Sequence, residues 1–413
     1  MKILIVEPMG HTIGHHTYYT RRLSESLLDT GQVERATVVS YAGFKDDWPK
    51  REGLRLIQAL PESMNVSWAP CERPDLWVEA TKAAMRVALP LAAEHDVMQV
   101  LDGHFLPLGW MLRRHPARHK TVMLWHYVPV GARLPPITRL PRGLRTRLRL
   151  TLPVILPERL LLSNTTLLVH AQQVADAIHG WLPRARVALI PPGSDPHAGD
   201  LPSRGEARRA LGLDIGDAPA LLVFGYLGTH KGVHTLMAAL EQDAPDLRLL
   251  IAGQPAAGVD IRAQVVDGGW EDRSVMRLAY VPDEQVPLWF RAADAVLLAY
   301  PHHFVQNSGV LTRAADFRTP VICSDVGQMG EFVLQYGLGT LFEPEEPRSM
   351  RAAIDEMLAA TPETIEGFRE GLARYAEDHS WPRIAQRHVE LYRRVAAGDL
   401  RDLEGPKSGG SKA

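Results

Sequence analysis

The sequence predicts an α/β protein made of two domains, each a doubly wound parallel sheet with helices on both faces. Three observations support this prediction. Short apolar runs of strand length alternate with helical stretches in both halves of the chain. Most of these runs are apolar throughout, as in strands that helices cover on both faces. The 413 residues, of which 46% are hydrophobic and 23% charged, are enough for two separate cores.

The first domain is expected over residues 1–190. It opens with a strand over 2–7, and a helix over 18–30 follows after a loop. Gly31 comes directly after this helix, where glycine readily takes the left-handed conformation that ends a helix. A strand, a loop and a helix in this order form the repeating unit of a doubly wound sheet. The later elements are a helix over 74–95 and strands over 38–41, 97–101, 122–125 and 167–170.

The loop over 8–16 bears on the expected ligand. Gly10 and Gly14 lie four residues apart, and no third glycine follows at the helix turn. A dinucleotide-binding loop has all three glycines in the spacing G-x-G-x-x-G. The loop therefore disfavours a nicotinamide enzyme.

The second domain is expected over 191–379. A strand begins at Val187, and the Pro and Gly clusters that follow it indicate a linker. A last helix within 380–398 is expected to pack back on the first domain, and 399–413 is expected to form a flexible tail. The strands of the second domain are expected over 220–224, 247–252, 275–280, 295–299 and 320–324.

Four stretches of the second domain share one pattern, a buried strand followed by a glycine-containing turn and a helix start. They cover residues 221–236, 280–300, 302–325 and 326–331. Backbone amides at such a helix start commonly hold the phosphate of a nucleotide or sugar. The sequence therefore predicts a phosphate-bearing ligand before any family is considered.

Charge and cysteine content exclude several classes of function. A net charge of −2 gives no overall attraction to nucleic acid. Cys71 and Cys323 lack a metal-binding spacing and are expected to be reduced and buried. The first residues lack the features of a secretory signal, and no uncharged apolar run reaches the roughly 18 residues of a membrane span. We therefore expect a cytoplasmic protein.

One stretch has an unusual charge pattern. Between Asp102 and Glu158 the chain has ten arginine and lysine residues and no acidic residue. Residues 133–157 interleave arginine with leucine, so a helix there would have a cationic face and an apolar face. Such a segment fits peripheral contact with the inner face of an anionic membrane, or an anionic acceptor. The alternative is a solvated segment whose arginines pair with carboxylates elsewhere in the fold.

Five motifs then succeed one another: VFGYLGTHKGVHTLMAAL, LRLLIAGQP, YVPDEQVPLWFRAADAVLLAY, SGVLTRAADFRTPVICSDVGQMGEFV and HSWPRIAQRHVELYRRV. In this order and spacing the chain resembles the retaining GT-B glycosyltransferases, especially glycosyltransferase family 4. The first half agrees through the loop of Gly14, the strand that ends at His126 and the segment VALIPPGSD. The resemblance covers nearly the whole chain.

The resemblance implies a GT-B fold, in which two Rossmann-like domains face each other across a cleft. The C-terminal domain would bind a nucleoside-diphosphate sugar, and the N-terminal domain a glycan, lipid-linked or small-molecule acceptor. The donor is a co-substrate, so no cofactor is expected. A metal ion is not expected either, because no convincing DxD motif occurs and nothing completes a ligand set with His11, His15 and His16.

Two helix starts are implied to hold the donor. The ammonium of Lys231, directly before Gly232, would meet the diphosphate, unless Lys231 is a plain surface lysine. The amides of Ser308, Gly309 and Val310 would approach phosphate oxygens, and Ser308 can cap the helix at the same time. Tyr280 and Val281 would frame the nucleobase. The other donor-binding candidates are Gly225, Tyr226, Asn307 and Glu331.

His126 is implied to reach the donor sugar or phosphate, with a purely structural histidine as the alternative. Together with Lys231 and Arg313 it makes up the catalytic candidates. The acceptor-binding candidates are Gly14, which lets the backbone approach a ligand, and His15 and His16.

Departures from the family pattern leave two functions open. Val305 and Arg313 stand where the family usually has glutamates, and Tyr226 stands where it has an arginine. The first function is a retaining, metal-independent glycosyltransferase that moves a sugar to a hydroxyl or amine. The alternative is a non-catalytic GT-B protein that acts as a binding partner or scaffold of an active transferase. A nucleotide-sugar epimerase of the same fold is a third possibility.

Overall fold

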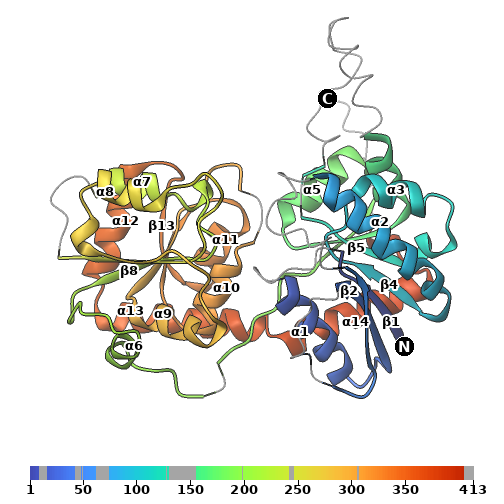
Figure 1. Ribbon diagram of the computed structural model, residues 1–413, viewed down its shortest axis with the longest axis horizontal. Helices are drawn as coiled ribbons and strands as arrows, with labels where there is room; N and C mark the ends of the chain where they lie inside the picture. The colour runs from blue at the N-terminus through green and yellow to red at the C-terminus, as the bar shows by residue number, and fades with distance from the viewer. Residues whose placement is uncertain are drawn as a thin grey trace, which may run out of the picture. The chain divides into compact units, whose positions relative to one another are not determined.

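The computed structural model consists of two compact units (Figure 1). Unit 1 comprises Met1–Pro191 and Trp381–Ala413, and unit 2 comprises Pro192–Ser380. The expected domain limits lie within one residue of these boundaries. The structure describes residues 1–8, 16–41, 48, 50–61, 74–126, 128–129, 155–197, 199–240, 246–304 and 307–403, without the side chains of residues 16 and 74.

Unit 1 contains a seven-stranded sheet in the order β3-β2-β1-β4-β5-β6-β7. All neighbouring strands pair in parallel, and the order of connection reverses between β1 and β4. The strands are β1 Lys2–Val6, β2 Arg35–Tyr41, β3 Leu54–Leu60, β4 Val97–Val100, β5 Thr121–Leu124, β6 Thr166–Val169 and β7 Arg186–Leu189.

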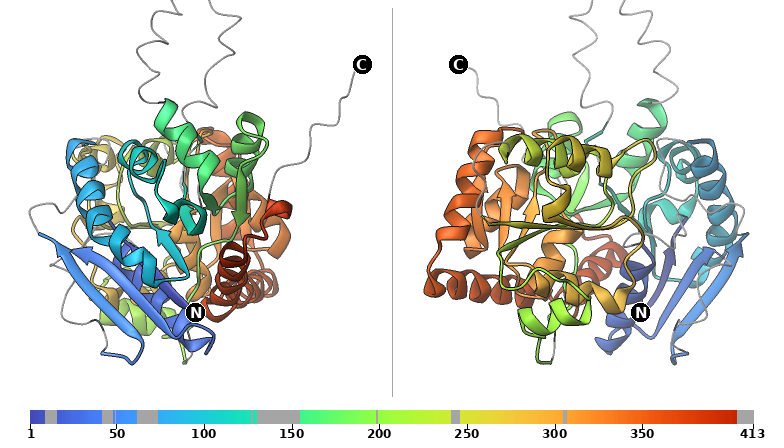
Figure 2. Two further views of the ribbon diagram at one scale, coloured as in Figure 1. Left: turned by 90° about the vertical axis from the view of Figure 1, so that its right-hand side faces the viewer. Right: turned by 60° about the vertical axis from the view of Figure 1, so that its left-hand side comes forward.

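Helices cover both faces of this sheet (Figures 1 and 2). The helix α14 packs against α1 on one face, while α2 lies on the other face and contacts α3. In α14 the buried residues Trp381, Ile384 and Val389 recur at helical spacing, which gives it an apolar stripe toward the sheet. The helices are α1 His16–Asp29, α2 Pro74–Leu91, α3 Phe105–Leu112, α5 Gln172–Trp181 and α14 Trp381–Ala397, and residues 155–164 are also helical.

Unit 2 contains a six-stranded parallel sheet in the order β10-β9-β8-β11-β12-β13, and its order of connection reverses between β8 and β11. The prediction of two doubly wound α/β units is therefore confirmed. The strands are β8 Ala220–Phe224, β9 Arg248–Ala252, β10 Ser274–Arg277, β11 Ala295–Leu298, β12 Val321–Ser324 and β13 Gly339–Phe342.

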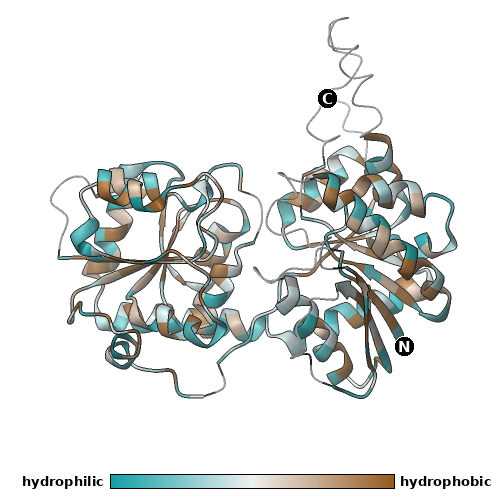
Figure 3. Ribbon diagram, viewed as in Figure 1, coloured by the Kyte–Doolittle hydropathy of each residue, from teal (hydrophilic) through white to brown (hydrophobic). Residues whose placement is uncertain are grey.

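Two core layers sandwich this second sheet, as the apolar strands between more polar helix surfaces show in Figure 3. Leu221 and Val223 of β8 pack on α7, α8 and α12, while Ala220 and Leu222 pack on the opposite layer. Burial on both faces explains why β8 is apolar throughout. The helices are α6 Arg204–Ala210, α7 Val233–Ala239, α8 Ile261–Asp267, α9 Val286–Ala292, α10 Gly309–Asp316, α11 Gly327–Tyr336, α12 Pro347–Ala359 and α13 Pro362–Asp378.

The structure contains strands that the sequence pattern did not reveal. The edge strand β3 is only partly buried and carries polar residues, so it lacks a continuous apolar run. The short strand β13 begins at Gly339, where a side chain would collide with the carbonyl oxygen of Val321. The strand expected over 275–280 ends at Arg277, so Tyr280 lies in the following loop.

Cys323 is a buried free thiol, as predicted, and Cys71 lies outside the described residues.

Candidate active site

Several of the predicted donor residues of unit 2, among them Gly225, Lys231 and Ser308, lie beyond the carboxyl ends of β8 and β11. The strand order reverses between these two strands, and in doubly wound sheets ligands bind at such a switch point. Gly225 directly follows β8 and has a φ of 100°, which favours glycine. A side chain at Gly253, after β9, would come within 1.7 Å of the Gly225 carbonyl oxygen. The two loop backbones therefore touch, and this contact fixes the turn at Gly225.

Lys231 is held inside the unit by the glycine that follows it. Gly232 has a φ of 62°, and a Cβ there would lie 2.7 Å from both the Cβ and the carbonyl oxygen of Ala299. The loop therefore presses against the end of β11, and the Lys231 side chain is buried. The alternative of a plain surface lysine is wrong.

The ammonium of Lys231 meets a residue that the sequence analysis did not single out, Tyr300. Lys231 Nζ donates a hydrogen bond to the Tyr300 hydroxyl at 3.0 Å, and it lies 5.1 Å from the centroid of the ring. The same hydroxyl lies 2.7 Å from Ser308 Oγ. Phe304 stacks on the Tyr300 ring with the centroids 4.1 Å apart. Tyr300 thus joins the loop after β8 to the start of α10.

Ser308 caps α10, as one of the sequence alternatives proposed. Its Oγ accepts hydrogen bonds from the amides of Val310 at 3.1 Å and Leu311 at 3.3 Å. The Val310 amide is therefore engaged by the cap. Gly309 is exposed, and the first amides of a helix have no partner within the helix. Of the three amides that were expected to approach a phosphate, that of Val310 is thus bonded to the cap, while Gly309 is exposed.

The two helix starts converge around Gly225. A Cβ at Gly225 would lie 3.5 Å from Val310 Cγ2 and 3.8 Å from Lys231 Nζ. His230 packs beside Tyr300, and burial, followed by the charge of Lys231, lowers the pKa of His230 to about 4. At neutral pH His230 is therefore uncharged, and Lys231 supplies the positive charge of this cluster.

Arg313 lies on α10 and pairs with a buried carboxylate. Its Nη1 lies 3.3 Å from Asp316 Oδ2. Asp316 also accepts hydrogen bonds from the Ser194 hydroxyl and, at 2.9 Å, from the Asp195 amide. Arg313 therefore takes part in a structural network within unit 2, which the prediction of a catalytic arginine did not foresee.

This network includes hydrogen bonds to the two segments where the chain enters and leaves unit 2. The amide of Ser194 donates to the carbonyl oxygen of His379 at 2.8 Å, and Ser194 forms a parallel bridge with Ser380. Both segments lie next to the unit boundaries. The helix α10 thus carries the Ser308 cap at its start and an anchor for the boundary segments at its end.

The remaining donor candidates lie on different loops and helices of unit 2. Tyr280 is 44% exposed, and its hydroxyl donates to Asp283 at 3.2 Å; burial and the nearby Asp283 raise its pKa to about 12. The Val281 side chain is buried in the core, so only its backbone can face a ligand. Asn307 Nδ2 donates to Gln328 Oε1 at 3.3 Å. Tyr226 is half-buried, and Glu331 is exposed on α11.

In unit 1, His126 lies two residues beyond β5 and pairs with Asp102. Its Nε2 lies 3.1 Å from Asp102 Oδ1, and the ring of His170 is 5.3 Å away. Burial lowers the pKa of His126, but the charge and hydrogen bond of Asp102 outweigh burial and raise it. Asp102 itself has a left-handed φ of 47°. The pair therefore favours a positively charged His126.

The sequence analysis missed Tyr300, Asp102 and His170 as site residues. Each lies within two residues of a strand end, where ligand-contacting side chains of parallel strands gather, and this position in the sequence could have identified them.

Gly14, His15, Val305 and the side chain of His16 lie outside the described residues. Among the residues that the structure describes, no group of three His, Cys, Asp or Glu side chains could hold a metal ion.

Comparison with known proteins finds a family match over part of the chain. Residues 218–360 match the family model "Glycosyl transferases group 1". The D-inositol 3-phosphate glycosyltransferase of Corynebacterium urealyticum is 30% identical over 238 residues, which cover 54% of this chain and 54% of that protein. The chain thus spans about half the length of the curated relatives it matches.

Solved structures extend the likeness to both units. Sucrose-phosphate synthase from Thermosynechococcus elongatus has a TM-score of 0.71 at 20% identity, covering 97% of this chain and 100% of that structure. The Anabaena HepE protein, solved with UDP and glucose, has a TM-score of 0.68 at 19% identity, covering 95% and 99%. The fold is that of the GT-B glycosyltransferases, as the resemblance implied. Within it, residues 218–360 form a domain of the glycosyl transferases group 1 family.

Replacing Lys231 with methionine is expected to weaken the binding of a nucleoside diphosphate by about 1.5–3 kcal/mol, the usual range for a hydrogen bond to a charged group. Methionine keeps most of the buried hydrocarbon but has no ammonium. Titration calorimetry measures the difference. Lys82→Met removes an exposed lysine that pairs with Glu79 in unit 1 and is the matched control. Equal affinities of the wild type and Lys231→Met would remove Lys231 from the site.

Replacing Tyr300 with phenylalanine removes the hydroxyl that Lys231 and Ser308 share. We expect the diphosphate affinity to fall by about 0.5–1.5 kcal/mol, and the effects of Tyr300→Phe and Lys231→Met to deviate from additivity by about 0.5–3 kcal/mol. A double-mutant cycle measured by calorimetry tests this coupling. Tyr336→Phe, which removes a hydroxyl bonded to Asp378, is the control. Additive effects would show that the hydroxyl and the ammonium act independently.

Asp316 should make stability depend on pH. Burial raises its pKa from 3.8 to about 7, against the opposing effects of Arg313 and the Ser194 hydrogen bond. An acid that binds its proton more tightly when folded contributes stability below its unfolded pKa and loses it as pH rises through the folded pKa.

Asp316→Asn cannot titrate at this position. Between pH 4 and 7, the free energy of unfolding of the wild type should therefore fall relative to that of Asp316→Asn, by up to about 4 kcal/mol. Urea unfolding of both proteins across this range measures the change. Parallel pH profiles would contradict the expected titration of Asp316.

Proposed function

We propose that this chain is a retaining glycosyltransferase that moves a sugar from a nucleoside diphosphate to an acceptor hydroxyl or amine without a metal ion. The observation that carries the proposal is the convergence of Gly225, Lys231 and the start of α10 at the switch point of unit 2. A buried ammonium and an exposed helix-start amide are groups that bind a diphosphate directly.

In the proposed reaction the acceptor oxygen or nitrogen forms a bond to the anomeric carbon as the bond from that carbon to the diphosphate oxygen breaks on the same face. Negative charge then develops on the leaving diphosphate, where the Lys231 ammonium and the Gly309 amide stabilise it. The acceptor proton passes to a diphosphate oxygen, so the step needs no protein nucleophile. His126, whose charged form is favoured by Asp102, is the candidate to donate a hydrogen bond to the sugar or a phosphate.

UDP is the first nucleotide to test as the leaving group. The Anabaena structural neighbour was solved with UDP and glucose. Tyr280, beyond the end of β10, would offer its exposed ring to the base. The neighbour's ligand supports UDP as a starting point, whereas the Tyr280 ring could stack on any base. The choice of sugar is left to the assay.

The acceptor and the location belong to the same proposal. The relative from Corynebacterium urealyticum is named for D-inositol 3-phosphate, an anionic compound. An anionic or lipid-linked acceptor would fit the ten basic residues between Asp102 and Glu158. Gly14, His15 and His16 remain the proposed acceptor contacts, and the inner face of the membrane remains the proposed alternative to a purely cytoplasmic location.

A non-catalytic nucleotide-binding partner of another transferase is the second candidate, and Arg313 favours it. Arg313 replaces a family glutamate and pairs with Asp316. A guanidinium cannot accept hydrogen bonds from a sugar or ribose hydroxyl, whereas the glutamate can. Such a protein would bind the nucleotide without turnover.

The test is a transfer assay on the purified protein with UDP-, GDP-, ADP- and TDP-sugars and with neutral and anionic acceptors, in the presence of EDTA. We expect release of one nucleoside diphosphate together with a product of retained configuration, and strong loss of activity in Lys231→Met. Nucleotide binding without transfer to any acceptor would favour the non-catalytic partner. An inverted product would contradict retention, and full inhibition by EDTA would contradict metal independence.

A further inference from the structure

Unit 1 carries an exposed surface, both cationic and apolar, that the proposed reaction does not use. We call it the α3 surface and define it by Trp110, Arg113, Arg114, Leu156 and Arg159. Trp110 and Leu156 are each 46% exposed, and the three arginines are exposed as well. Large apolar side chains gathered at the surface of a folded unit mark a binding surface more often than isolated ones do.

The residues of the α3 surface come from two helices in backbone contact. A Cβ at Gly109 would lie 2.1 Å from the carbonyl oxygen of Pro157, so α3 touches the helix over 155–164. Trp110 follows Gly109 and Leu156 precedes Pro157, so both exposed apolar residues are next in sequence to this contact. The absence of a side chain at Gly109 allows the two helices to approach this closely.

The cations of the α3 surface face solvent. The Arg113 guanidinium lies 4.9 Å from the centroid of the Trp110 ring. Among the ion pairs formed by the described residues, none involves Arg113, Arg114 or Arg159. No acidic residue occurs between Asp102 and Glu158, and Glu158 is buried. The positive charge of this surface is therefore not neutralised by neighbouring carboxylates of the same stretch.

We propose that the α3 surface docks unit 1 on a bilayer that contains anionic lipid. Tryptophan prefers the headgroup level of a membrane, and arginine is drawn to anionic headgroups. A nucleic acid, bound mainly through its phosphates, would leave Trp110 and Leu156 without a partner. No helix in the described part of the chain is long and apolar enough to cross a membrane, so the contact is peripheral. The residues of this surface lie outside the proposed donor site.

Co-sedimentation of the full chain with phosphatidylcholine vesicles, with and without phosphatidylglycerol, tests the proposal. We expect binding only to vesicles with phosphatidylglycerol, and weaker binding at high salt. The double variant Arg113→Glu, Arg114→Glu should reduce the partition coefficient by about tenfold or more, because each basic residue near the surface adds to the attraction. Trp110→Ser should reduce it by about threefold or more through loss of the interfacial aromatic ring.

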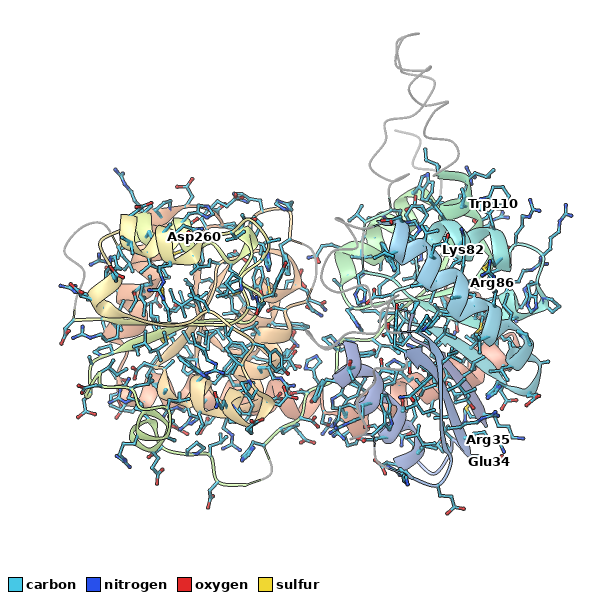
Figure 4. The ribbon with its side chains drawn as sticks, in the orientation of Figure 1. Glu34, Arg35, Lys82, Arg86, Trp110 and Asp260 are labelled. Carbon is cyan, nitrogen blue, oxygen red and sulfur yellow. The ribbon has the colours of Figure 1, made fainter. Side chains whose placement is uncertain are left out.

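The controls change residues away from the α3 surface, namely the half-buried Arg35 and the exposed Leu334. Figure 4 shows Arg35 and Trp110 at opposite ends of unit 1, so Arg35→Glu is the charge control. Leu334, 71% exposed in unit 2, provides the apolar control Leu334→Ser. Both controls should bind vesicles as the wild type does. Lys231→Met should also bind vesicles as the wild type does, although it is expected to lose transfer activity. Failure of the membrane proposal can therefore be told apart from failure of the proposed transfer activity.

Three outcomes would overturn the proposal. The first is no binding to vesicles with phosphatidylglycerol, and the second is equal binding to both kinds of vesicle. The third is wild-type binding by Arg113→Glu, Arg114→Glu and by Trp110→Ser, both confirmed as folded by thermal unfolding. Binding carried by the arginines within 133–149 alone would give this third result, and it would overturn the assignment of the interaction to the α3 surface.

Discussion

The hydrogen bond between the Lys231 ammonium and the Tyr300 hydroxyl is the interaction on which the candidate site depends. A buried ammonium is costly unless it is hydrogen-bonded and its charge is compensated. Here the described partner is a neutral hydroxyl, which fixes the position of the ammonium without cancelling its charge. An anionic ligand would supply the missing compensation. The same hydroxyl contacts Ser308, so the cation and the start of α10 are held by one group.

The backbone makes this interaction possible. Gly253 lets the turn after β9 touch the turn after β8, and Gly232 lets the loop after β8 press against the end of β11. The helix α10 then extends from the Ser308 cap to Asp316, which anchors the segments at the unit boundary. The helix that contributes to the candidate site thus also secures the chain where it enters and leaves unit 2.

Much of this could be read from the sequence, because strands covered on both faces and glycine-containing helix starts leave local patterns. The strands of unit 2 from β8 to β12, the position of Lys231 and the Ser308 cap were predicted in this way. The edge strand β3 and the short strand β13 lack a continuous apolar run. The contacts of Tyr300 could not be read from the sequence, because its partners are 69 and 8 residues away and only the fold brings them together. The pairing of Arg313 with Asp316, and of Asp316 with Ser194, likewise depends on tertiary packing.

The central claim is that unit 2 recognises the diphosphate of its ligand through Lys231 and the start of α10. The most direct measurement is a calorimetric titration of the full chain with uridine, UMP and UDP under identical conditions. Our account predicts that affinity rises with each phosphate, and that the gain from uridine to UDP largely disappears in Lys231→Met. Uridine binding as tightly as UDP, or an undiminished gain in Lys231→Met, would contradict it.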